Sequence, residues 1–343
     1  MKAILTRGRS EVDVNDVAPP RLVNPGDVVV RMRACGLCGS DLEKVYGQYG
    51  MTSARLGHEP AGEIVEVGSA VSDFAVGDRV FVHHHVACYS CHFCRHGDYT
   101  MCPKYQSSNI DPCGLAEKFL VPEWNVSRGG MIRLPASLDY DAASLVEPLA
   151  CCIRALGKSS FQEGDDVAVL GCGPAGMMHV ALATDLGAGN VFASDVNEFR
   201  LAFAAKSGAV ALNASSADIS ARIKADTDGR GVDLCIVATG STKAILQAFE
   251  ITRRGGDIVL FGVPPKGSQM AIDASRLYSL EHSLIPSYAA SEIETNQAIR
   301  LLENRRLNLD SLITHRFDIS QGAEAVRCAH DAKDAMKVII TTK

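Results

Sequence analysis

The 343-residue sequence lacks the features of membrane-spanning and nucleic-acid-binding proteins. No apolar run approaches the ~18 residues of a membrane span, and the apolar run in residues 1–6 is too short for a signal peptide. The formal net charge of −6 leaves no basic surplus for nucleic acid or a membrane surface. Apolar residues make up 47% and charged residues 22%, which is ordinary for a soluble globular chain of about two domains. We therefore expect a cytoplasmic protein without nucleic-acid or membrane partners.

Cysteine, in contrast, is abundant. There are twelve cysteines in a long chain with no export signal, and four of them crowd into residues 88–102. In a reducing compartment such a cluster indicates metal binding and not disulfides. Cys88, Cys91, Cys94 and Cys102 can surround one zinc ion in a closed tetrahedron, which braces a lobe and leaves no position for chemistry. The other cysteines outside position 38 are most simply buried small apolar groups.

Three alternatives compete for this part of the chain. Four unrelated thiols would be reactive in an exposed loop, and a nucleic-acid-binding zinc ribbon would need a basic surface that the sequence lacks. The triplet His83-His84-His85 also suggests a metal site. Adjacent strand residues point to opposite faces, so three consecutive histidines cannot chelate one ion from an extended chain.

A second group of potential zinc ligands is dispersed along the sequence. Cys38, His58, Glu59 and Glu147 offer a thiolate, an imidazole and two carboxylates, which are the ligand types that zinc takes. Cys151 or Cys152 could instead supply a thiolate, and Cys151 shares a helical face with Glu147. A catalytic zinc would need one position open for a substrate oxygen.

A glycine-rich turn indicates a dinucleotide. Gly171-Cys-Gly173-Pro174-Ala175-Gly176 follows an apolar run at 167–170 and precedes a helical segment. In such a turn the glycines allow a tight bend, close approach to a pyrophosphate and close helix–strand packing. Asp195 stands at the end of the next predicted strand, where a carboxylate binds the ribose hydroxyls and favours NAD over NADP. Arg200 could contact the adenosine ribose or, turned towards a phosphate, tolerate NADP.

The patterning divides the chain into an α/β protein of two domains. Alternating runs at 28–33, 62–68 and 76–82 predict a barrel-like β domain in residues 1–147. From residue 148 to 286, strands at 166–170, 190–194, 232–238 and 257–262 alternate with helices, which predicts a doubly wound parallel (Rossmann) sheet. A helix at 292–303 and strands at 313–319 and 337–341 are expected in residues 287–343.

These motifs in this order resemble the zinc-containing medium-chain dehydrogenases/reductases of the alcohol dehydrogenase superfamily. The resemblance covers essentially the whole chain and favours the polyol (sorbitol-type), threonine and secondary-alcohol branches. It implies a GroES-like catalytic domain to which residues 287–343 return, and a structural zinc in a lobe at about 84–115. It also implies a homo-oligomer, dimer or tetramer, that pairs near residues 262–285.

The resemblance assigns roles to the dispersed ligands. Cys38 and His58 correspond to primary ligands of a catalytic zinc, Glu147 stands where related branches use a cysteine or an acid, and Glu59 is either a ligand or an outer group. Thr239 and Val263 lie where the nicotinamide side is lined. The family's polyol branch accounts for Glu147 in place of a cysteine.

Three residues that follow Cys38 are expected to assist. Asp41 suits a carboxylate that receives the second ring N–H of His58 and fixes its tautomer. Ser40 suits a relay that takes the alcohol proton. Many relatives carry a histidine five residues after the ligand cysteine, and this chain has Glu43 there. Glu43 is therefore either the exit of the relay or a solvated acid.

The sequence thus predicts a zinc-dependent enzyme that transfers a hydride between a secondary alcohol and NAD. The substrate would be a polyol, a sugar-like or a hydroxy-amino compound, with one catalytic and one structural zinc per chain. A simple secondary-alcohol dehydrogenase or aldehyde reductase, or an NADP-using member, is the alternative. A non-catalytic cofactor-binding protein is disfavoured because all the inferred ligands are present.

Overall fold

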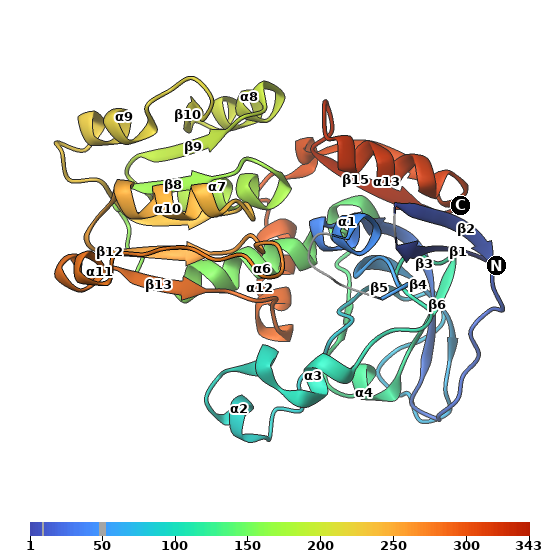
Figure 1. Ribbon diagram of the computed structural model, residues 1–343. Coiled ribbons are helices and arrows are strands. Elements are labelled where there is room, and N and C mark those ends of the chain that lie inside the picture. The colour runs from blue at the N-terminus through green and yellow to red at the C-terminus, as the bar shows by residue number, and fades with distance from the viewer. Residues whose placement is uncertain (9, 48–52) are drawn as a thin grey trace. The chain divides into compact units, whose positions relative to one another are not determined.

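The computed structural model describes residues 1–8, 10–47 and 53–343 and contains two compact units (Figure 1). Unit 1 comprises Met1–Ala150 and Ala289–Lys343, and unit 2 comprises Cys151–Tyr288. Among the described residues, no helix is both long enough and apolar enough to cross a membrane.

Unit 2 is a parallel α/β sheet. Its strands are β8 (Val167–Leu170), β9 (Val191–Asp195), β10 (Val210–Asn213), β11 (Val232–Val237), β12 (Thr252–Leu260) and β13 (Ser283–Pro286). Within the described residues the six strands are all parallel, in the order β10-β9-β8-β11-β12-β13. This order is the 3-2-1-4-5-6 arrangement of the dinucleotide-binding fold, which confirms the predicted doubly wound sheet.

Helices connect these strands. They are α7 (Pro174–Asp185), α8 (Glu198–Lys206), α9 (Ile219–Asp226), α10 (Thr242–Ile251) and α11 (Ala274–Leu280). α7 packs on β8 and β9, and α10 packs on β11 and β12. All residues of β8 are buried, as expected for a central strand covered on both faces. The sequence interpretation did not identify β10 or β13, and in β13 no residue is fully buried. Such a short outer strand has a weak apolar pattern.

Unit 1 is built on a mainly antiparallel sheet. Its strands are β3 (Val28–Gly36), β4 (Glu59–Val67), β5 (Arg79–Val82), β6 (Lys118–Val121), β7 (Met131–Arg133), β14 (Ile313–Asp318) and β15 (Lys337–Thr341). In the part of the chain that is described, these seven strands run β14-β15-β3-β4-β5-β7, with β6 also paired to β3. A separate hairpin joins β1 (Lys2–Gly8) and β2 (Glu11–Asp16). The C-terminal strand β15 pairs with β3 of this sheet, so residues near both ends of the chain share it.

The helices of unit 1 are mostly short. They are α1 (Gly39–Tyr46), α2 (His92–Arg95), α3 (Pro103–Ser107), α4 (Glu123–Val126), α5 (Tyr140–Ala143), α12 (Glu292–Glu303) and α13 (Gly322–Asp331), with α6 (Val146–Gly157) beginning in this unit. The core joins sheet residues, among them Met32, Ile64, Phe119 and Ile340, with buried residues of α1 and α13. α12 begins at a capping box of Ser291 and Glu294, which satisfies its first amides.

Candidate active site

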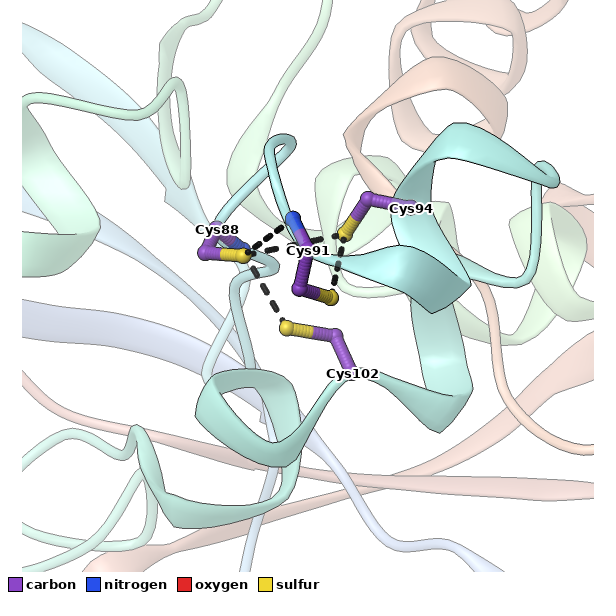
Figure 2. A group of neighbouring side chains, drawn as sticks. All are labelled: Cys88, Cys91, Cys94 and Cys102. Carbon is purple, nitrogen blue, oxygen red and sulfur yellow. Dashed lines mark hydrogen bonds between the residues drawn. The ribbon is translucent and has the colours of Figure 1, made fainter.

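The four clustered cysteines converge on one point in the lobe around α2. Figure 2 shows their sulfur atoms facing one another. The Sγ of Cys94 lies 3.6 Å from that of Cys91 and 3.9 Å from that of Cys88. These are too long for disulfide bonds of about 2.05 Å. A zinc tetrahedron with metal–sulfur bonds of about 2.3 Å places its sulfurs roughly 3.8 Å apart, so the spacing fits one zinc ion.

Backbone amides stabilise negative charge on this cluster. The amide of Cys91 donates to the Cys88 sulfur at 3.3 Å, and the amide of Cys88 donates to the Cys102 sulfur at 3.4 Å. The amide and hydroxyl of Ser90 contribute most to lowering the pKa of Cys88, to about 5. Burial and the neighbouring thiols raise the pKa of Cys94 to about 12. Sulfurs this close cannot all be thiolates unless a cation lies among them.

A second cluster forms where β3 meets β4. Cys38 is the N-cap of α1, and its backbone amide donates to the Asp41 carboxylate at 3.2 Å. Antiparallel pairing sets Gly36 opposite Glu59, so the residues after β3 meet those at the start of β4. As a result Cys38, His58 and Glu59 each offer a ligand atom within 4.8 Å of the other two. These three side chains form a group that could hold a metal ion. His58 is 9% exposed and Glu59 is completely buried.

Asp41 lies beside the His58 ring. Its Oδ1 lies 3.5 Å from the His58 Nδ1 and accepts the Gly57 amide at 2.9 Å. Burial opposes charge on Asp41, but the His58 imidazole outweighs it and holds the Asp41 pKa well below its usual range. In the same way Asp41 and Cys38 raise the pKa of His58 despite its burial. Because a metal binds neutral imidazole, metal binding at Nε2 would release this proton.

The two glutamates differ in their relation to the cluster. Glu147, in the first turn of α6, is buried and has its Oε2 4.0 Å from the His58 Nε2. Glu59 is completely buried, and its Oε1 has no hydrogen-bond partner among the described residues. Burial raises the pKa of Glu59, and the ammonium of Lys337 opposes this rise. Within the described residues, neither Cys151 nor Cys152 joins the group that could hold a metal.

The three consecutive histidines separate in role. His83 Nδ1 pairs with Glu292 at 2.7 Å, and His85 Nδ1 lies 2.5 Å from the Ser108 carbonyl. The ring of His84 instead lies 5.2 Å from that of His58. Burial and the imidazoles of His85 and His58 hold the pKa of His84 well below its usual value, so the ring is neutral near pH 7. The sequence offered no reason to choose His84 over His83 and His85, because no local pattern shows which of the three lies beside His58.

Ser40 and Glu43 belong to the same helix as Asp41. Ser40 lies in the first turn of α1 and is partly exposed, and Glu43 lies one turn further and is partly buried. Their positions are compatible with the predicted relay, which stays a prediction.

The glycine-rich turn of unit 2 has the expected shape. Gly171 has a positive φ of 101°, which favours glycine, and it leads from β8 into α7. A Cβ on Gly176 would stand 1.8 Å from the carbonyl oxygen of Gly171, so no other residue fits there. Gly173 is the N-cap of α7, and Pro174 and Ala175 begin the helix. The N-terminus of α7 thus presents amides suited to an anion.

Acidic and basic side chains meet beside this turn. Asp195 ends β9, and its carboxylate lies 3.9 Å from Nη1 of Arg200. The guanidinium of Arg200 also lies near Gly173. A Cβ placed on Gly173 would be 3.8 Å from Arg200 Nη1. Thr239 follows β11 and Val263 follows β12, at the same edge of the parallel sheet. Val263 is 55% exposed.

Fold and site together define a zinc-dependent oxidoreductase with a dinucleotide-binding domain. The Alcohol dehydrogenase GroES-like domain family matches residues 24–136, and the Zinc-binding dehydrogenase family matches residues 174–304. The sorbitol dehydrogenase of Bacillus subtilis (strain 168) is 32% identical over 99% of this chain and 97% of its own length. The L-threonine 3-dehydrogenase of Pyrococcus abyssi is 32% identical over 92% of this chain and 90% of its own length.

A solved structure from Sinorhizobium meliloti 1021 is also similar. It is described as a zinc-binding dehydrogenase bound to NADP, is 27% identical, and has a TM-score of 0.87 over 99% of this chain and 98% of that one. The chain therefore belongs to the zinc-containing alcohol dehydrogenase family, and the predicted family and its GroES-like and Rossmann folds are confirmed.

Proposed function

We propose that the protein is a zinc-dependent dehydrogenase that transfers a hydride between NAD and the secondary hydroxyl of a polyol, a sugar-like or a hydroxy-amino compound. The observation that carries the proposal is the buried group of Cys38, His58 and Glu59 with Glu147 beside it. Residues 1–147 and 287–343 would form the catalytic domain, and residues 148–286 the cofactor domain.

Two zinc sites follow from the donor sets. Cys38, His58 and Glu147 would hold the catalytic zinc, with Glu59 within reach of it as a ligand or an outer group, while Cys88, Cys91, Cys94 and Cys102 would hold the structural zinc. The unpartnered Oε1 of buried Glu59 supports the first site, and the sulfur spacing supports the second. Zinc bound at the first site would lower the pKa of a substrate hydroxyl, as it lowers that of water from 15.7 to about 7.

The side chains around that site would handle the proton and the geometry. Asp41, whose Oδ1 lies 3.5 Å from the His58 Nδ1, would hold the ring so that Nε2 faces the cluster. Ser40 would take the proton of the substrate hydroxyl and pass it outward. Glu43 would stand either at the exit of this path or as a solvated acid. Bound NAD would accept the hydride at its nicotinamide ring.

The cofactor choice rests on Asp195. Its carboxylate, at the end of β9, would accept bonds from the ribose hydroxyls and repel a 2′-phosphate. The glycine turn from Gly171 to Gly176 would receive the pyrophosphate, and Thr239 and Val263 would line the nicotinamide side. Arg200 is near enough to Asp195 to reduce the repulsion between its carboxylate and a 2′-phosphate, so use of NADP is the alternative.

A polar group beside the metal ligands favours a polar substrate. The imidazole of His84 lies next to His58 and is partly exposed, although its Nδ1, unpartnered among the described residues, is itself buried. A substrate with several hydroxyls could bond to the exposed part of such a ring, whereas a simple alcohol has no second hydroxyl to do so. The sorbitol and threonine dehydrogenases similar to this chain agree with this choice. A simple secondary-alcohol dehydrogenase or aldehyde reductase remains the competing function.

We further propose a cytoplasmic homo-oligomer, dimer or tetramer. The cysteines of the described residues form no disulfide bond, which is compatible with a reducing compartment. β13 is an outer strand of its sheet, and Tyr278 nearby is 86% exposed. An open strand edge with an exposed aromatic favours pairing near residues 262–285.

Metal analysis with a substrate panel tests the function. We expect two zinc ions per chain and NAD-linked oxidation of polyols or threonine that exceeds oxidation of short alcohols. Cys38→Ser should leave one zinc per chain and abolish turnover with the fold intact. Full activity of Cys38→Ser, or a single zinc in the unaltered protein, would refute the proposal.

A further inference from the structure

A lysine lies buried beside the candidate metal ligands. Lys337, the first residue of β15, is 2% exposed. Its Nζ donates to Glu59 Oε2 at 2.5 Å and to the Leu37 carbonyl at 3.1 Å. The ion pair joins residues 278 positions apart, because β15 and β4 both pair with β3. A fully buried charge is costly without a partner, and Glu59 is the charged partner of this lysine.

The backbone leaves room for this pair at one glycine. A Cβ on Gly36 would stand 1.8 Å from Glu59 Oε2 and 2.7 Å from Lys337 Cε. Any other residue at position 36 would push the carboxylate or the lysine away. The Glu59–Lys337 ion pair therefore depends on the glycine at position 36, where β3 faces β4.

The two carboxylate oxygens of Glu59 have different surroundings. Oε2 is held by Lys337, while Oε1 has no hydrogen-bond partner among the described residues. Glu59 also has an oxygen within 4.8 Å of the ligand atoms of both Cys38 and His58. A buried carboxylate close to a cation gains by binding it, because an unpaired buried charge is costly, and a second positive charge competes for that carboxylate. Lys337 is that competing charge.

We propose that Lys337 is a positioning residue that restrains Glu59 from completing the coordination of the catalytic metal, and so keeps one position open for the substrate oxygen. This inference rests on the proposed function. Lys337 donates a hydrogen bond to Glu59, whereas its effect on Glu147 is that of a nearby charge, and Glu147 would remain the acidic ligand. A closed four-ligand site binds metal tightly and is inert, whereas a catalytic site needs a vacant position.

The test uses Lys337→Met, which keeps the length and volume of the side chain but not its charge. We expect zinc to leave the catalytic site about 10- to 100-fold more slowly in a chelator, with kcat lower by a similar factor, the range typical of groups that contact metal ligands. The cobalt-substituted variant should show an altered visible spectrum that no longer responds to an added alcohol. A merely structural lysine predicts the opposite for the metal, which would leave faster as activity falls.

Two further variants complete the test. Lys337→Arg keeps the charge and should retain near-normal metal release and turnover. Lys337→Met/Glu59→Gln removes the freed ligand, so metal release should return towards that of the unaltered protein. If Lys337→Met does not fold, Lys337→Gln, which can still bond to the Leu37 carbonyl, takes its place.

The outcomes separate the two proposals. Slower metal release with lower kcat supports the inference. Faster release, or release and turnover both unchanged in a protein that holds two zinc ions, would overturn it while leaving the proposed function intact. A protein that holds only the structural zinc would overturn the proposed function itself.

Discussion

The carboxylate of Asp195 accepts a hydrogen bond from the backbone amide of Cys172 at 2.7 Å, which ties the end of β9 to the glycine-rich turn. Its other oxygen accepts the amide of Asn197 at 2.9 Å. Asp195 therefore has a structural role in addition to its proposed contact with ribose, and a test of cofactor choice must preserve the first while it removes the charge.

Asp195→Asn meets this requirement in part, because its amide oxygen can still accept the bond from Cys172, while the bond from the Asn197 amide is lost. We expect the ratio of kcat/KM for NADP to that for NAD to rise at least about tenfold, since like charges ~4 Å apart near a protein surface repel by roughly 4 kcal/mol. Arg200→Ala in the same background should reverse part of the gain. An unchanged ratio in Asp195→Asn would exclude the proposed ribose contact.

The cysteine lobe should matter for stability and little for substrate choice. Cys91→Ser is expected to leave one zinc per chain and to lower Tm by roughly 5 °C or more, since a structural zinc contributes folding free energy. Relative rates on a substrate panel should stay the same. Cys328→Ser, at a cysteine of α13 outside both metal-binding groups, is the matched control and should keep both zinc ions. A changed substrate preference with an unchanged Tm would contradict the bracing role.

His84 should influence which alcohols react. His84→Phe keeps a planar ring and removes its hydrogen-bonding nitrogens, so kcat/KM for a polyol should fall roughly 2- to 10-fold relative to a simple secondary alcohol, as expected for one lost hydrogen bond. His92→Phe, at an exposed histidine of α2, should have no such effect. Equal loss on both substrates would show that His84 does not contact the substrate.

A charged network in unit 2 gives a pH-dependent prediction. Asp233 contacts Arg253 Nε at 2.5 Å and Arg230 Nη1 at 2.9 Å. Burial opposes the charge of Asp233, but the bonds from Arg253, the Asp166 amide and Arg230 outweigh it and lower its pKa. A carboxylate with a lowered folded-state pKa stabilises the fold above its unfolded pKa of about 3.9, and this stabilisation is lost as the pH falls through the folded-state value.

Asp233→Asn should therefore lower the free energy of unfolding at pH 7 by about 1–3 kcal/mol, and the difference should shrink below about pH 4. Urea unfolding at several pH values measures this. Asp13→Asn breaks an exposed pair with Arg7 and should change stability by less than about 1 kcal/mol at any pH. A difference between Asp233→Asn and the unaltered protein that is constant with pH would contradict the assigned cause.

Much of the cofactor domain could be predicted from local sequence. The runs at 167–170 and 191–193 are continuous apolar segments, and the structure has strands at 167–170 and 191–195. The predicted helix at 292–303 coincides with α12, because Ser291 and Glu294 cap it. The segment from 140 to 157 forms two helices, α5 and α6, since the chain turns at Ser144 and Leu145 between them. β12 begins at Thr252, five residues before the predicted start, where arginines and glycines hide the strand pattern.

What the sequence determined by itself is chemistry that depends on neighbours along the chain. The spacing of Cys88, Cys91, Cys94 and Cys102 restricts their sulfurs to a small volume, and the glycines at 171 and 176 permit one close turn. Only the tertiary structure decided which groups contact the buried charged side chains. Strand pairing brings Lys337 to Glu59 and places His84, and not His83 or His85, beside His58. Such contacts arise from sheet register across hundreds of residues, for which no local pattern of residues is a signal.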